Sequence, residues 1–384
     1  MRIPYPSRSG RTRAASAAGI VLMTGAALVG CSSTEDDTTS TQSTASESAA
    51  TSSSSSSSAA SSSDCNADSG YSKITCLSNE LIASADADLA SSMVLDYSLD
   101  TAQKWSNFPP QGYRDRVGPT LSEFSPEQLA LVMDIVKEAS GTADNEGYDE
   151  IQQILNADDY LAANATGRDG GFGSENFHFA FLGTPSDTGT WELYYGGHHT
   201  AFANTYTDGV LVGATPSFRG VEPGYSFDEN GRSNMPMEQE RVAFANLVGS
   251  LTPGQQAAAK QDEVYTDILV GPQKDGQFPA TQTGVPVSSL SEDQKALVVA
   301  AMNTYVSDID DADAATILAK YTAELDNTYV AFSGTTAVDQ VSDYVRIDGP
   351  SVWIEFVLQA GASLDGAHPH SVWRDKVADY GGTD

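Results

Sequence analysis

The spacing of apolar residues changes near residue 175, and this change constrains the fold more than any other feature. Before it, apolar residues recur at intervals of three and four, as in Leu129, Val132 and Met133, which is typical of amphipathic helices. After it, NFHFAFLG, TWELYYGG and TAFANTYTDGVLVGAT alternate or run apolar between glycine turns, and DYVRI and SVWIEFVLQ follow later. The sequence therefore predicts an α+β fold, with N-terminal helices packed against an antiparallel β-sheet.

Three expected helix starts share one signature. FSPEQLALVMDIV, LTPGQQAAAK and LSEDQKALVVAAM each place Ser or Thr at the N-cap and Gln three residues later. The capping hydroxyls are expected at Ser125, Thr252 and Ser291. The signature indicates a weak internal repeat, and we assign it to helix packing. Between about residues 222 and 290, glycine, proline and helix signals alternate without defining a topology.

The first 63 residues are predicted to lie outside this fold. A basic, then apolar segment ends in LVGC, which resembles a bacterial lipobox, so residues 1–30 are predicted to be a lipoprotein signal peptide and Cys31 the acylated N-terminus. The alternative is an ordinary signal peptide with a chance cysteine. Residues 31–63 are rich in Ser and Thr and are predicted to be a flexible tether. Residues 64–384 are then expected to form a single domain, exported and lipid-anchored to the outer face of the bacterial cell membrane.

Cysteine use and charge limit the partners. Once Cys31 is acylated, Cys65 and Cys76 are the remaining pair, and we expect a disulfide in preference to a metal site. The chain carries 52 acidic residues against 20 basic ones. This balance argues against nucleic acid or anionic lipid as a partner, so the lipid anchor is the one expected membrane contact. No protein partner is inferred.

Four of the five histidines occur as two close pairs, in YYGGHHTAF and AHPHSVWRD. His198 and His199 are expected on a tight turn between two strands, where the preceding glycines permit an irregular backbone that lets both rings converge. His368 and His370 have the i, i+2 spacing that places two side chains on one face of an extended segment. The fifth, His178, alternates with phenylalanines on a predicted strand and is expected to be structural.

Together the two pairs offer three or four imidazole nitrogens, which predicts a site for a transition metal, zinc or copper. Arg374 and Asp375 are the candidate catalytic residues because they follow the second pair closely. Other acids could supply a fourth ligand, orient a histidine or act as a base; they are Asp365, Glu192, Glu222 and Glu355.

Several functions remain open. The carboxylates and the lack of soft ligands favour a metal-dependent hydrolase over a copper oxidoreductase. The alternative is a non-enzymatic surface lipoprotein that binds a metal or a polar small molecule, and a further alternative has the histidines in structural hydrogen bonds with no metal. The chain lacks G-x-S-x-G, H-E-x-x-H, a P-loop and a dinucleotide fingerprint. Nothing supports a serine hydrolase built on Ser371 or Ser217.

The stretches FLGTPSDTGTWELYYGGHHTAF, ATPSFRGVEP and AHPHSVWRDKVADYG resemble the family called domain of unknown function 3500, over most of residues 85–382. The resemblance implies that the two histidine motifs form parts of one site, and it implies no particular activity. Here HHT stands where the family has HHL, which should alter packing without touching the rings. The matching positions are Gly183, Pro185, Trp191, Gly197, His198, His199, Thr215, Pro216, Phe218, Gly220, His368, His370, Arg374, Asp375, Asp379, Tyr380 and Gly381.

Overall fold

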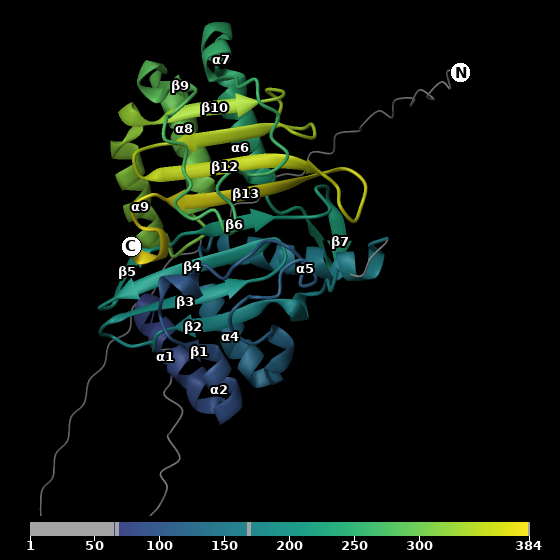
Figure 1. Ribbon diagram of the computed structural model, residues 1–384, viewed down its shortest axis with the longest axis vertical. Coiled ribbons are helices and arrows are strands. Elements are labelled where there is room, and N and C mark those ends of the chain that lie inside the picture. Colours follow the sequence, from purple (N-terminus) through teal and green to yellow (C-terminus); the bar gives the residue numbers. More distant parts are fainter. Residues whose placement is uncertain (1–64, 66–68, 167–169, 383–384) are drawn as a thin grey trace, which may run out of the picture. The chain divides into compact units, whose positions relative to one another are not determined.

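The computed structural model describes residues 65, 69–166 and 170–382. Within these residues the protein has an α+β fold, as predicted, built around an 11-stranded sheet (Figure 1). The expected signal peptide, the acylated Cys31 and the tether lie outside the described residues. A disulfide joins Cys65 to Cys76 in the first helix, which confirms the predicted pair and indicates an oxidising, exported environment. None of the described helices is long and apolar enough to span a membrane.

The sheet has the order β1-β2-β3-β4-β6-β13-β12-β11-β10-β9, and β5 also pairs with β4. β1 runs parallel to β2, so the sheet is mixed, while the other pairings are antiparallel. β7 and β8 form a separate ribbon. The strands are β1 Val94–Leu95, β2 His178–Leu182, β3 Thr190–Gly196, β4 Thr200–Thr207, β5 Val210–Gly213, β6 Ser217–Gly220, β7 Phe227–Glu229, β8 Arg232–Asn234, β9 Val285–Pro286, β10 Tyr329–Ser333, β11 Tyr344–Asp348, β12 Val352–Ala360 and β13 Ala367–Asp375.

The helices begin and end largely where capping residues and prolines predict. The stretch from Gly70 to Met93 forms two helices, because the carboxylate of Asp86 accepts a hydrogen bond from Leu89 N and starts the second. The helices are α1 Gly70–Ser84, α2 Ala87–Met93, α3 Leu99–Ala102, α4 Pro126–Glu138, α5 Gly147–Asn164, α6 Glu238–Ser250, α7 Pro253–Ala259, α8 Glu292–Val306 and α9 Asp311–Ala323. Short 3₁₀ turns occur at Leu121–Glu123, Ser174–Asn176, Val287–Ser289 and Leu325–Asn327, and Asp379–Gly382 forms an irregular turn with left-handed residues.

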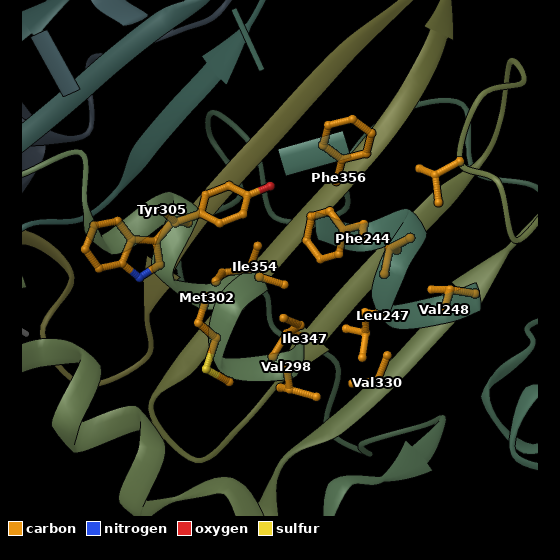
Figure 2. Close-up of a cluster of buried hydrophobic side chains, with 14 of the residues drawn as sticks. Phe244, Leu247, Val248, Val298, Met302, Tyr305, Val330, Ile347, Ile354 and Phe356 are labelled. Atoms are coloured by element: carbon orange, nitrogen blue, oxygen red, sulfur yellow. The ribbon is translucent and has the colours of Figure 1, made fainter. Parts of the chain in front are cut away.

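One face of the sheet carries the larger helices. A row of cross-strand partners runs across eight strands on that face and packs in the two largest hydrophobic clusters, which also hold buried residues of α1, α4, α5, α6 and α8. Figure 2 shows part of this packing, with Phe244 and Leu247 of α6 and Val298 and Met302 of α8 around Ile347 and Ile354 of the sheet. The row is Phe179, Tyr195, Phe202, Ser217, Trp373, Ile354, Ile347 and Val330.

The opposite face is covered by two irregular segments rather than by long helices. Trp105 and Val117, from the segment before α4, pack with strand residues such as Tyr194 and Phe218. Tyr265, from the segment before β9, stacks on Tyr344 with ring centroids 3.9 Å apart. These two segments are called the first and second cover segments below, residues 97–119 and 260–282. His368 and His370 lie on this face, together with Val372 and Arg374, because alternate residues of β13 point the same way.

The sheet consists of two halves with the same order of elements. The first half contains α1, α4, α5, β2, β3 and β4, and the second contains α6, α8, α9, β10, β11 and β12. α1 packs on α4 as α6 packs on α8, and both α4 and α8 begin with a Ser–Gln capping box. From one edge of the sheet inward the first half runs β2, β3, β4, and from the other edge inward the second half runs β10, β11, β12. The halves meet where β6 pairs with β13.

The equivalence of the halves extends to individual contacts. Leu121 N donates to Phe177 O at 2.7 Å, and Val287 N donates to Thr328 O at 2.8 Å. A Cβ added to Gly118 would lie 2.2 Å from Phe179 O, and one added to Gly284 would lie 2.2 Å from Val330 O. Two of the three capping signatures in the sequence, those of α4 and α8, therefore belong to a larger structural repeat.

Candidate metal centre

The GHH turn joins β3 to β4 at the expected place. Gly197 N donates to Thr200 O at 2.8 Å, and Gly220 N of β6 donates to His199 O at 2.7 Å. A Cβ on Gly197 would lie 2.5 Å from the ring of Phe177, so only glycine fits there. His199 adopts a left-handed backbone conformation with φ +63°, which is uncommon for a residue with a side chain. The turn thus holds His199 in a strained conformation through contacts on both sides.

The second histidine pair lies at the start of β13, beside the turn. His370 is the cross-strand partner of Gly220 on β6. A Cβ on Gly220 would lie 3.0 Å from Cδ2 of His199 and 3.1 Å from Cδ2 of His370. The absence of a side chain at this position leaves room for the two imidazole rings to meet.

Three of the four predicted histidines converge. His199, His368 and His370 each offer a ring nitrogen, and these nitrogens lie within 4.8 Å of one another. The Nε2 atoms of His199 and His370 are 3.2 Å apart. All three residues are buried, with 3–6% of their surface exposed. We call this set the histidine triad.

His198 lies beside the triad and not within it. Its ring stacks on that of His199 with centroids 3.7 Å apart, and its Nδ1 is 2.5 Å from Oδ1 of Asp158 on α5. The ring of Phe172 also packs against the ring of His198, with centroids 5.1 Å apart. The structure therefore brings all four histidines to one place, with three grouped as possible ligands.

Two polar side chains contact His370. Its Nδ1 is 3.2 Å from Oδ1 of Asp267 in the second cover segment and 3.5 Å from Nδ2 of Asn107 in the first. A carboxylate on Nδ1 holds that nitrogen as N–H and leaves Nε2 with a free lone pair. The side chain of Asp267 is 45% exposed, whereas the three histidines are buried.

The electrostatics of the triad suit a metal. Burial and the neighbouring histidines lower the pKa of His199 well below its usual value, and burial together with His370 lowers the pKa of His368 to about 3. These rings are therefore neutral near pH 7, as metal ligation requires. Nδ1 of His368 is buried and has no hydrogen-bond partner, which is costly unless another group satisfies it. The donor set fits zinc or copper.

Arg374 and Asp375 have partners of their own. Arg374 shares the face of His370, but its guanidinium is held by Asp275 at 2.6 Å and Asp379 at 2.7 Å. Asp375 points to the opposite face of the sheet, where its carboxylate accepts hydrogen bonds from Lys320 and Tyr321, both at 2.9 Å. The structure does not bring Asp375 together with the histidines, because neighbouring strand residues face opposite ways.

The other acids that the sequence offered are also placed elsewhere. Glu192 accepts from Thr205, Glu222 accepts from three successive backbone N–H groups that begin at Ala362, and Glu355 accepts from Leu269 N and Val270 N of the second cover segment. Asp365 is exposed in the hairpin between β12 and β13. Ser371 Oγ bonds to Tyr305, and Ser217 Oγ accepts from Arg219. His178 bonds to Gly118 O at 2.9 Å, as expected of a structural histidine.

Sequence reasoning missed the two carboxylates that do contact histidines. Asp158 occupies the apolar stripe of α5 that contains Ile151, Ile154 and Leu161, and an acid in such a stripe signals a buried partner. Asp267 lies in an irregular segment whose path the sequence does not define, and we find no local signal for it.

The comparisons with known proteins identify a family and no activity. The model of a family described as protein of unknown function (DUF3500) matches residues 67–382. No curated protein and no solved structure matches the chain.

Proposed function

Because the chain belongs to the DUF3500 family, whose description names no activity, we propose from the site alone that it is a metal-dependent hydrolase. The convergence of His199, His368 and His370 carries this proposal. Three imidazoles are the protein ligands of many catalytic zinc sites, which keep a fourth position for water or substrate. A metal held in this way lowers the pKa of a bound water and polarises a substrate carbonyl.

The chain's own residues would perform distinct tasks. Asp267 orients His370 and fixes which of its nitrogens faces the metal. Asp158 fixes the ring of His198, which packs on His199 and closes one side of the triad. The segment around Asn107 holds the turn, because Asn107 O accepts from His199 N at 3.2 Å.

The two halves of the sheet argue against a merely structural role for the histidines. The turn of the second half that corresponds to Gly197–Thr200 is Gly349–Val352, and its closing hydrogen bond is also 2.8 Å. That turn uses Pro350 and Ser351 where the first half has His198 and His199. The fold therefore does not require histidine at this turn.

Hydrolysis is favoured over redox chemistry because nitrogen ligands beside carboxylates suit zinc. Copper sites of electron-transfer proteins use a cysteine thiolate. The two cysteines among the described residues form the disulfide with each other. Copper chemistry remains the alternative reaction, and a non-enzymatic lipoprotein that binds a metal or a polar small molecule is the alternative function.

The location of the protein is part of the proposal. The lipobox-like LVGC and the Ser/Thr-rich stretch after it support a protein that is exported and lipid-anchored through Cys31 to the outer face of the bacterial cell membrane. Mass spectrometry of the mature N-terminus tests this directly. A diacylated or triacylated cysteine is expected, and an unmodified N-terminus elsewhere would contradict it.

The activity is tested with the full chain loaded with zinc or copper and assayed on chromogenic esters, amides, lactams and phosphoesters. We expect zinc-dependent turnover of at least one class, loss of turnover in His370→Asn, and retention in His178→Asn, the matched histidine outside the site. Metal binding without turnover would favour the non-enzymatic alternative. Oxidation of a test substrate by the copper form alone would favour the oxidoreductase.

A further inference from the structure

We infer that the metal centre selects uncharged or cationic substrates and disfavours anionic ones such as phosphoesters and carboxylates. This inference rests on the proposed metal site and concerns the charge of what reaches it. Two observations support it: acids contact the histidines, and the buried arginines discussed below are already bound by other groups of the protein.

Within the part of the chain that the structure describes, the two charged side chains in hydrogen-bonding contact with the four histidines are both acids. Asp158 is 2.5 Å from His198 and is buried, and Asp267 is 3.2 Å from His370 and half exposed. A divalent cation bound to neutral imidazoles would be balanced in charge by these two carboxylates. An anionic ligand would then make the site net negative, whereas an uncharged ligand would leave it balanced.

Arg116, a buried cation that contacts the GHH turn, cannot offset these acids for an incoming anion. Arg116 lies in the first cover segment, and its guanidinium donates to the carbonyl oxygens of Ser106 at 2.8 Å, Tyr113 at 3.0 Å and Gly197 at 3.3 Å, and to that of Phe108. Arg116 is 8% exposed. Arg116 therefore links the first cover segment to the GHH turn. Its guanidinium is too occupied and too buried to bind a substrate.

Two further buried arginines, Arg374 and Arg219, are also occupied. Arg374 is bound by Asp275 and Asp379. Arg219 faces the helices, where it lies 3.5 Å from both Glu150 and Asp308. Metal hydrolases of anionic substrates need a clamp of cationic groups for the anion, and none of these arginines is free to form one.

The exposed half of Asp267 adds a positive preference. A half-exposed carboxylate beside a metal site can accept a hydrogen bond from an amine or amide N–H of a substrate. The inferred substrates are therefore uncharged or amine-bearing compounds with a hydrolysable carbonyl group.

The inference is tested with the full chain loaded with cobalt(II), whose visible absorption reports ligands that enter the coordination shell. Azide serves as the anionic probe and imidazole as the neutral one. In Asp267→Asn the affinity for azide should rise about five-fold, because one negative charge is removed, while the affinity for imidazole should stay within about two-fold. Asp262→Asn, an exposed acid earlier in the same segment, should change neither affinity.

The outcomes separate this inference from the proposed function. If the wild-type chain binds no cobalt, the metal site itself is refuted. If cobalt binds and Asp267→Asn leaves azide affinity unchanged, the charge selection alone is refuted. If Asp267→Asn fails to hold cobalt, Asp158→Asn, which removes the other carboxylate, takes its place: azide affinity should again rise, and an unchanged azide affinity would overturn the inference.

Discussion

The turns Gly197–Thr200 and Gly349–Val352 occupy equivalent places in the two halves of the sheet, and we call them the two corners. They have the same backbone hydrogen bonds but different side chains. Gly197 and Gly349 close their turns with hydrogen bonds of equal length, and the neighbouring strand then bonds to the turn in both halves, from Gly220 N to His199 O and from Lys376 N to Ser351 O. In the second half the side chain of Ser351 donates to Glu324 at 2.8 Å and contributes to packing. In the first half the ring of His199 lies beside His368 and His370 of β13.

This difference shows which features of the corner serve the fold and which serve chemistry. The backbone hydrogen bonds are common to both corners and belong to the fold. The histidines, the left-handed conformation of His199 and the partnerless Nδ1 of His368 occur at one corner alone among the described residues. Features that cost free energy and that the matching corner omits are expected at a functional site.

The largest expected effect separates the corners by their response to metal. Zinc at about 1,000 times its dissociation constant should stabilise the wild type by about 4 kcal/mol. His199→Asn should abolish this gain, because Asn tolerates a left-handed backbone but lacks the imidazole. Ser351→Asn at the matching corner should keep it. Thermal unfolding with and without zinc measures the effect, and equal responses of the two variants would contradict the comparison.

The next effect tests whether the halves are equivalent in packing. Gly118 and Gly284 both have positive φ and both approach a strand carbonyl oxygen. Gly118→Ala and Gly284→Ala should each lower the free energy of unfolding by about 2 to 4 kcal/mol, since an added Cβ cannot be accommodated without moving the backbone. Urea titration measures both. A severe loss in one variant and none in the other would show that the repeat is superficial.

Buried acids make the stability of the fold depend on pH. Burial raises the pKa of Glu192 to about 8, and one of its oxygens has no partner. Burial also raises the pKa of Glu355 in the second half, but that carboxylate accepts four hydrogen bonds, which act to lower its pKa. A raised carboxyl pKa means that the folded state binds more protons than the unfolded state between the two pKa values, so stability falls as pH rises. Histidines with a lowered pKa destabilise the fold as pH falls, but only below about pH 6.5, where the unfolded state begins to bind their protons. They therefore do not affect the slope above that pH.

Between about pH 6.5 and 8, Glu192→Gln should therefore reduce the decline in stability by about 1.4 kcal/mol per pH unit, the share of one proton. Urea unfolding at three pH values measures the slope. Glu150, whose pKa burial raises to about 8, should preserve part of the decline in the variant. A slope identical to that of the wild type would mean that Glu192 is ionised in the fold.

The smallest effect concerns the repeated helix caps. Ser125 Oγ accepts from Gln128 N, and Ser291 Oγ accepts from Gln294 N, both at 3.3 Å. Ser125→Ala and Ser291→Ala should each cost about 1 kcal/mol of stability, because each leaves helix N–H groups without a partner. Denaturant midpoints measure the two variants side by side. A cost confined to one helix would limit the repeat to the strands.

The sequence predicted the parts of the site that depend on local pattern. Glycines before His198 predicted an irregular turn, and the spacing of His368 and His370 predicted two rings on one strand face. The same alternation places Asp375 on the other face from His370, so the grouping of Asp375 with the site neglected a rule that the sequence already contained.

The remaining features depend on long-range packing. The meeting of β6 with β13 brings together residues about 150 positions apart, and nothing local encodes it. Asp158 and Asp267 reach the histidines from a helix and from an irregular cover segment. Which member of the His198–His199 pair enters the triad is decided by the backbone of His199, whose φ follows from contacts with Asn107 and Gly220.

We propose that one corner of the repeated sheet holds a metal ion. Elemental analysis by mass spectrometry tests this on the full chain, purified without a histidine tag and exposed to zinc and copper, beside folded His199→Asn and Ser351→Asn variants. We expect about one equivalent of a single metal per chain in the wild type and in Ser351→Asn, and none in His199→Asn. No metal in the wild type, or an equal amount in His199→Asn, would contradict it.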